Sequence, residues 1–560
     1  MKRISTQPRL FLAINFFLSF AILLAACAPP VAQLTSVPQV IRETVVVEGQ
    51  VIEKVVTATP EPSPAPPPAD QPLEKARLAL NSRIVQMDPH GVASVSQFIT
   101  LFMGGGQLFR LNPDYSVVPY LAEKYEVSAD GLIFTITLKP DLKFSDGSPL
   151  TAEDVAYGYA RSVEMKSPRL NLLGPVKSFT AKDPRTVEIT LERPYANLLI
   201  GLSDFGNTIF PKAKVQADPD FFKKAPMVGS GQYVLTKWEP GATEWALEEN
   251  PNFFGGPSMI KRVEIVAVPD QTSRTLQLIT GDLDYGYDIP GSAKADLPQE
   301  VKTFVVPLNG VYVIAINLEA AKTSPLGNPK VRQAISLAVD RKTIQDRAFY
   351  GISPVVDGFL YKGPPEGLAV LPNGGKRDLE AAKKLLAETP YKDGFKFTIQ
   401  PWGQRPGWTD AATIIKENLG ELGIQVTVDP KGDADAIALM NSGGYETQFS
   451  GNLGDPLTYF TQYFTPGGNW NKWLRYNNPQ VTELVIQAGS TLDREERIKI
   501  FHDMQKLLVE EMPFVPLTER VVLVASSLPR NILCEANLGV GYNPNIATVQ
   551  QFTSGTGPCK

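Results

Sequence analysis

The chain has 560 residues, two histidines, three cysteines and a formal net charge of −5, with acidic and basic residues interspersed. The scarcity of histidine and cysteine argues against a histidine-rich zinc site or a Ser-His-Asp triad, and the charge pattern argues against binding to nucleic acid or an anionic membrane surface. Because the chain is long for a single core, we expect more than one domain.

The N-terminus has the pattern of a lipoprotein signal peptide. Basic residues precede an apolar run over residues 10–24, which is too short to span a bilayer comfortably, and two alanines precede Cys27. This pattern resembles a bacterial lipobox, which implies cleavage after residues 1–26 and lipidation of Cys27. We therefore expect a protein anchored by lipid to the outer face of the cell membrane or in the periplasm. An ordinary signal peptide, or a membrane anchor with a chance cysteine, is the alternative.

Residues 27–76 lack the apolar periodicity that a core requires. The proline-rich segment 60–68 favours extended polyproline conformations, and the valine-rich stretch 45–56 is isolated, so that any pairing within it would be transient. We interpret the whole segment as a tether that holds the folded part near a membrane.

The remainder has the alternating pattern of a mixed α/β protein. Residues 132–138 alternate as a half-buried strand, and Thr151 then caps a helix that extends to about residue 161. Further helices are expected from Pro329 and after Asp378. Residues 395–428 read as strand, helix and strand, which predicts a βαβ unit with parallel strands.

Two cysteines remain at the C-terminal end. Cys534 and Cys559 are a plausible disulfide in an oxidising compartment, and closing that loop would contribute about 3 kcal/mol. Two free thiols are the alternative.

Enzymatic function has little support in the sequence. His90 and His502 are far apart, and the S-x-x-K match at 258–261 lies in a turn that leads into a strand. Carboxylates are plentiful, so a secreted hydrolase stays open as the alternative class, but no specific acid pair stands out. We expect a binding protein that is not an enzyme and has no cofactor or metal.

Two loops that follow strands are promising pocket walls, because ligands of open α/β sheets bind beyond the carboxyl ends of strands. The loop 401–408 carries two indoles and a guanidinium, and the segment 451–456 follows a strand-like stretch at 445–449. The ligand-binding residues that we predict are Gln107, Trp402, Gln404, Arg405, Trp408, Asn452, Asp455 and Trp470.

A resemblance to a known family rests on a long run of residues and on several shorter ones in order. The run resembles the signature of the peptide/nickel (family 5) extracellular solute-binding proteins, and the similarity covers about residues 77–525. The matching segments are 121–125, 128–131, 134–139, 143–150 and 151–155, with 87–90, 229–233, 250–254, 281–284, 331–335 and 340–341 agreeing as well.

The resemblance implies a periplasmic-binding-protein-like α/β fold of the large three-domain type. Two lobes are joined by two crossing segments that act as a hinge, and a small extra domain is inserted early in the chain. The boundaries that it implies are residues 77–111, 209–308 and 521–560 for lobe I, 112–208 for the inserted domain and 309–520 for lobe II.

The resemblance also implies a function, namely capture of a small solute by hinge closure and its delivery to the permease and ATPase of an ABC importer, by a monomer. Peptide-binding members place an aspartate against the ligand's ammonium group, and that position is Asn452 here. Since a neutral amide cannot serve as the counter-ion, either Asp455 or another acid holds the ammonium group, or the ligand has none. Peptides and oligosaccharides therefore both stay open, nickel itself is the weakest candidate, and a sensory receptor of the same fold is a further alternative.

Overall fold

The chain forms two units in a computed structural model, residues 1–65 and 66–560, and each is described by itself. In the first unit β1 (Gln39–Val47) pairs antiparallel with β2 (Gln50–Ala58), so the valine-rich stretch forms a regular hairpin. The predicted signal peptide and all three cysteines lie outside the described residues. Those that the structure describes are 39–47, 50–58, 72–80, 83, 87–91, 106–111, 117–167, 170–403, 405–468 and 470–528.

A ten-stranded mixed sheet runs through the second unit. We call the part that contains β3 and β10 to β13 lobe I, and the part that contains β15 to β17 lobe II. In spatial order the strands are β10 (Tyr233–Lys237), β11 (Glu244–Glu249), β12 (Ile260–Ala267), β3 (Leu73–Leu80), β13 (Tyr285–Gly286), β18 (Phe514–Ser526), β14 (Lys302–Ile316), β17 (Thr447–Leu453), β15 (Lys396–Pro401) and β16 (Gln425–Val428).

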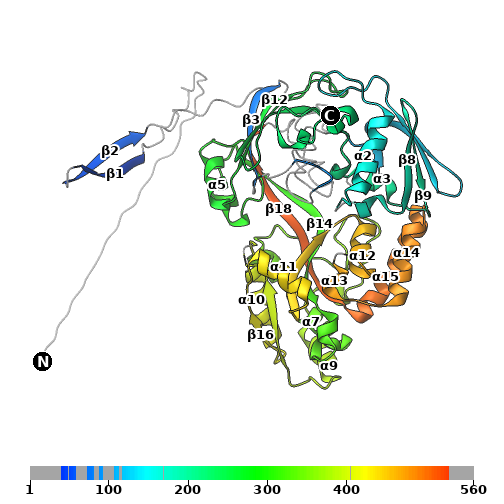
Figure 1. The fold of residues 1–560 in the computed structure, drawn as a ribbon. Helices are drawn as coiled ribbons and strands as arrows, with labels where there is room; N and C mark the ends of the chain where they lie inside the picture. Colours follow the sequence, from blue (N-terminus) through cyan, green and yellow to red (C-terminus); the bar gives the residue numbers. More distant parts are fainter. Residues whose placement is uncertain are drawn as a thin grey trace, which may run out of the picture. The chain divides into compact units, whose positions relative to one another are not determined.

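The long strands β14 and β18 pair antiparallel and connect the two lobes (Figure 1). Their ladder is regular from Lys302 to Pro307, and its register then shifts between Pro307 and Val311 and again before Val313. Such irregularities let a strand pair bend locally. These two strands are therefore the crossing segments that the sequence comparison with the family led us to expect.

The βαβ unit predicted in lobe II is confirmed. β15 and β16 are parallel, with α10 (Trp408–Gly420) between them, and β17 lies parallel to β15 on its other side. The predicted caps are also present, since the Asp378 carboxylate accepts a hydrogen bond from the amide of Ala381. The other lobe II helices are α6 (Leu318–Ala321), α7 (Pro329–Ala338), α8 (Arg341–Thr343), α9 (Leu379–Ala387), α11 (Asp433–Ser442), α12 (Pro456–Phe464), α13 (Asn471–Leu474), α14 (Pro479–Ser490) and α15 (Arg494–Glu511).

Arg341 fixes the corner between α7 and α8 against β18. Its side chain is 1% exposed and donates to the backbone carbonyls of Ser336, Gly375 and Pro516 at 2.8, 3.1 and 2.8 Å. Burial lowers the pKa of this guanidinium to about 10. The charge is held by carbonyl dipoles, which is how a buried ion without a counter-ion is tolerated.

The segment between β5 and lobe I forms a separate small sheet with its own core. The strands β6 (Ala122–Val127), β7 (Ile133–Leu138), β9 (Thr186–Leu191) and β8 (Val176–Asp183) pair in that order, and α2 (Ala152–Glu164) packs against β8 and β9. The N-terminus of α2 is a capping box, in which Asp154 also accepts from the Thr151 amide at 2.9 Å. Shorter elements are β4 (Phe109–Leu111), β5 (Val117–Pro119), α3 (Leu198–Gly201), α4 (Lys212–Ala217) and, beside lobe I, α5 (Gln271–Ile279).

Distinct hydrophobic clusters support the three parts. One is built on the lobe I strands around Trp245 and Tyr285, one on the lobe II sheet around Phe449 and Phe514, and one in the inserted domain around Ile136. The fold is thus two lobes and an extra domain, while the boundaries given above stay a prediction. Within the part of the chain that the structure describes, no helix is both long and apolar enough to cross a bilayer.

Candidate functional site

A cavity of about 310 Å³ lies where lobe I, lobe II and the β14–β18 pair meet. We call it the interlobe cavity. Its walls come from the turn after β13, from the turn before Ile352, from the loop that begins α10, and from the two long strands themselves. The residues that the argument below uses are Asp288, Tyr312, Arg405, Trp408, Asp410 and Arg520.

Aromatic rings form one wall of the interlobe cavity. Tyr312 on β14 stacks on Phe349 with ring centres 4.8 Å apart and planes 2° apart, and Trp408 contacts Tyr312 edge-on at 5.6 Å. Trp408 is the first residue of α10 and is 5% exposed, so this indole mostly completes the core of lobe II. The preceding Gly407 has a φ of 75°, and a Cβ there would lie 2.4 Å from the Ala348 carbonyl oxygen. Only glycine lets the loop approach so closely.

Arg405 is the predicted site residue that best fits a ligand-binding role. It lines the interlobe cavity, and its guanidinium carbon lies 5.5 Å from the ring centre of Trp402. Trp402 itself is half-buried, and its indole N–H donates to the Gln448 side chain at 3.3 Å. The structure therefore brings Arg405 and Trp408 into one cavity and places Trp402 beside Arg405.

Arg520 is a cavity residue that sequence reasoning missed. It lies on β18, lines the interlobe cavity, and donates from Nη1 to the Gly451 carbonyl oxygen at 2.6 Å. Its guanidinium carbon is 5.6 Å from the ring centre of Tyr312. The neighbouring charges of Glu519 and Arg520 in a mostly apolar strand are the signal that could have revealed it, because such charges need specific partners.

Two carboxylates also line the interlobe cavity. Asp288 lies 3.8 Å from the guanidinium of Arg274, a buried residue of α5, so its charge already has a partner. Asp410 lies in the first turn of α10, where the partial positive charge of the helix end favours an acid. Both acids therefore have local structural reasons to be where they are.

Asp455 caps a helix and connects two parts of the protein. It is 1% exposed and caps α12, since its carboxylate accepts from the Thr458 amide at 3.1 Å. The same oxygen accepts from the Asn197 side-chain amide at 2.6 Å, which links the inserted domain to lobe II. Asp455 is also not among the residues that line the interlobe cavity.

Gln107 and Trp470 are not among the residues that line the interlobe cavity. Gln107 is 2% exposed, and it precedes β4 at the inserted domain. Trp470 packs on Tyr463 with ring centres 5.1 Å apart. The backbone of Asn452 pairs with Val311 within β17 and β14, and Gln404 lies outside the described residues.

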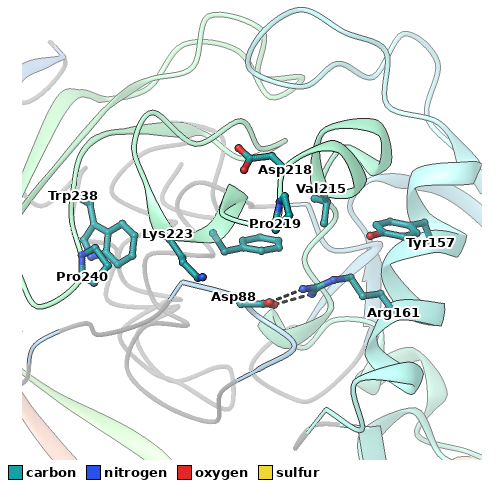
Figure 2. Close-up of a pocket in the computed structure, with 10 residues that line it drawn as sticks. Asp88, Tyr157, Arg161, Val215, Asp218, Pro219, Lys223, Trp238 and Pro240 are labelled. Carbon is teal, nitrogen blue, oxygen red and sulfur yellow. Dashed lines mark hydrogen bonds and ion pairs between the residues drawn. The ribbon is translucent and has the colours of Figure 1, made fainter.

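A second cavity, of about 500 Å³, lies beside α2 (Figure 2). Asp88 and Arg161 form a two-bonded ion pair there at 2.8 and 2.6 Å, and His90 Nδ1 lies 2.8 Å from the same guanidinium. Burial, and then the charge of Arg161, lower the pKa of His90 to about 4. The charged lining residues Asp218 and Lys223 also have ion-pair partners in the protein. The contacts of Arg161 with Asp88 and His90 therefore attach residues 87–90 to α2 of the inserted domain.

No group of three His, Cys, Asp or Glu side chains in the described part of the chain is arranged to hold a metal ion. His502 lies on α15 with Nε2 3.0 Å from the Pro365 carbonyl oxygen, so it interacts with a loop of lobe II.

Comparison with known proteins agrees with this architecture. The model of the bacterial extracellular solute-binding proteins, family 5 Middle, matches residues 116–471. The probable D,D-dipeptide-binding periplasmic protein DdpA of Escherichia coli K12 is 27% identical over 422 residues, which is 71% of this chain and 78% of that protein. The glutathione-binding protein GsiB of Salmonella paratyphi A is 26% identical over 472 residues, covering 80% of this chain and 90% of that protein.

Solved structures have the same fold. The periplasmic binding protein AgaA of A. tumefaciens R10, in complex with agropinic acid, has a TM-score of 0.70 at 25% identity, over 86% of this chain and 98% of that one. The substrate-binding protein CtaP of Listeria monocytogenes has a TM-score of 0.73 at 20% identity, over 85% and 99% of the two chains.

Proposed function

Because the chain belongs to the bacterial extracellular solute-binding proteins of family 5, we propose that its interlobe cavity holds the solute that it captures for an ABC importer. The observation that carries this proposal is that one cavity is lined by groups of lobe I, of lobe II and of the β14–β18 pair. A solute that contacts both lobes favours the arrangement in which they are closed, and the permease recognises that closed form.

The lining suits a small polar solute with an apolar part. The rings of Tyr312 and Trp408 offer apolar surface, and Arg405 offers a rigid fork of donors. The binding of D,D-dipeptides by DdpA and of glutathione by GsiB, as their names state, favours a peptide or a peptide-like compound. An oligosaccharide is the second candidate, because indole faces stack on sugar rings and Asn452 replaces the acid that would hold an ammonium group.

The remaining parts of the proposal are supported by the same membership and by the lipobox-like pattern before Cys27. The chain acts without covalent chemistry, as a monomer, and Cys27 carries the lipid that holds it at the outer face of the membrane. Its partners are the permease and ATPase subunits of the importer. The relatives named above are binding proteins, which supports a role other than catalysis.

The test is a thermal-shift screen of the mature domain, followed by calorimetry of each hit. A solute that binds only the native state raises stability by RT ln(1 + [L]/Kd), about 2.7 kcal/mol at a hundredfold excess over Kd. The panel contains di- to pentapeptides, oligosaccharides and nickel chelates. We expect stoichiometric binding of one class with no product formed. Turnover of a peptide or glycan by the pure protein would instead favour a hydrolase.

A further inference from the structure

The side chain of Arg520 has unused hydrogen-bonding capacity at the interlobe cavity. One of its donors is used by the Gly451 carbonyl oxygen. Its Nε is buried and has no acceptor, and no carboxylate of the described residues lies within 4 Å of its guanidinium. A buried donor without an acceptor is unfavourable, so Arg520 has hydrogen-bonding capacity that the described residues around it do not use.

The neighbourhood of Arg520 holds this side chain in place. A Cβ at Gly451 would lie 2.7 Å from Cδ of Arg520 and 2.9 Å from Cδ1 of Tyr312. The guanidinium also lies over the Tyr312 ring, which favours a cation. A glycine backbone on one side and a ring on the other therefore fix where the positive charge can be.

The acids that line the interlobe cavity do not neutralise this charge. Asp288 is the partner of Arg274 at 3.8 Å, and Asp410 lies at the N-terminal end of α10. Neither is within ion-pair distance of Arg520 in the described structure. The group that best matches the geometry of a guanidinium is a carboxylate, because the two form a pair of parallel hydrogen bonds.

We infer that Arg520 selects solutes that carry a carboxylate, and that it binds that group directly when the solute occupies the interlobe cavity. The inference rests on the proposed function, since it assigns the chemical class of the solute for the same cavity. The carboxylate can be the C-terminus of a short peptide or the acid group of a sugar acid, and both present the same two oxygens. Arg520 is then the residue that distinguishes acidic solutes from their neutral analogues.

The experiment compares matched acid and neutral probes by calorimetry. The probes are glycyl-leucine with glycyl-leucinamide, and a disaccharide that ends in glucuronic acid with its glucose counterpart. For the wild-type protein we expect the acid of at least one pair to bind between about tenfold and about a hundredfold more tightly than the neutral form. The peptide pair and the sugar pair separate the two sources of the carboxylate.

Variants then assign the preference to one side chain. Arg520→Gln should abolish the preference for the acid, while Arg520→Lys should keep part of it because the charge remains without the fork. Arg262→Gln is the matched control, since Arg262 is a half-buried lobe I residue paired with Glu248 and Glu264 and its replacement changes the net charge equally. A melting temperature for each variant shows whether it is folded.

Several results would overturn the inference. If the wild-type protein bound the acid and neutral forms equally well, the inference would be wrong, whereas the proposed function would be unaffected. An unchanged acid preference in folded Arg520→Gln would also overturn the inference. If none of the four probes, and no member of the wider panel, bound at all, the proposed function would fail and the inference with it.

Discussion

Replacing Asp455 by alanine separates a structural role for this acid from a ligand-anchoring one. The variant would lose the hydrogen bonds that this carboxylate accepts from the Thr458 amide at 3.1 Å and from the Asn197 side chain at 2.6 Å. Loss of an N-cap costs about 1 kcal/mol, and loss of a buried charge-assisted hydrogen bond costs about 1.5 to 3 kcal/mol. We therefore expect the variant to be less stable by about 3 kcal/mol.

The assay is a thermal melt followed by tryptophan fluorescence. A folded region of roughly 450 residues has an unfolding entropy of about 1 kcal/mol per kelvin, so this loss should lower Tm by about 3 °C. Asn197→Ala is the matched control, because it removes the second bond but keeps the cap on α12, and it should give the smaller shift. The double variant should then be little worse than Asp455→Ala.

A measurement of solute affinity could contradict the structural role of Asp455. If Asp455 is structural, the variant should keep its affinity for the captured solute at temperatures where it is folded. An unchanged Tm together with a large loss of affinity for solutes that carry an ammonium group would refute the structural assignment, and would restore Asp455 as the anchor.

Three further predictions concern other residues. Arg341→Met should lower the free energy of unfolding by more than about 3 kcal/mol, measured in urea, because three buried carbonyl oxygens lose their donor. His90 has a pKa of about 4 in the folded protein and about 6.5 in the unfolded chain, so the unfolded chain takes up a proton first as the pH falls. About 3 kcal/mol of stability should therefore be lost between pH 6.5 and pH 4. His90→Gln should make stability less dependent on pH in this range, as measured by a series of melts at different pH. Gly451→Ala should weaken solute binding in calorimetry by displacing Arg520, whereas Gly158→Ala, where a Cβ meets nothing within 4 Å on the helix α2, should only stabilise the protein by about 0.5 to 1 kcal/mol.

The alternation of apolar and polar residues predicted those strands and helices that have one buried and one exposed face. The strand at β7 and the βαβ unit at β15 to β16 have clear alternation, and their caps are unambiguous, so their position and type followed from short stretches of sequence. In β14 and β18 most residues are buried, so neither period 2 nor period 3.6 stands out. Their pairing depends on contacts between distant parts of the chain, and only the resemblance to a family predicted it.

The candidate site was predicted in part for the same reason. Arg405 belongs to a loop whose composition is unusual, and that is visible in the sequence. Arg520 follows Glu519 within a mostly apolar strand, and its role depends on Gly451 and Tyr312, which are distant in sequence. Asp455 could have been recognised as a cap, because it precedes Pro456 at the first turn of a helix. Trp470 packs on Tyr463, and an indole near a loop can fill a core as readily as face a ligand, so its role stays a prediction.

The position of β18 in the sheet determines when the protein can complete its folding. This strand is the last of the described chain, yet it pairs with β13 in lobe I and with β14, and it supplies Val522 and Val524 to the lobe I core. The sheet of lobe I therefore cannot be completed until residues 514–526 have been synthesised. Because contacts between distant parts of a chain form slowly, this part of the fold forms late. Such a chain is suited to threading through a translocation channel before it folds on the far side.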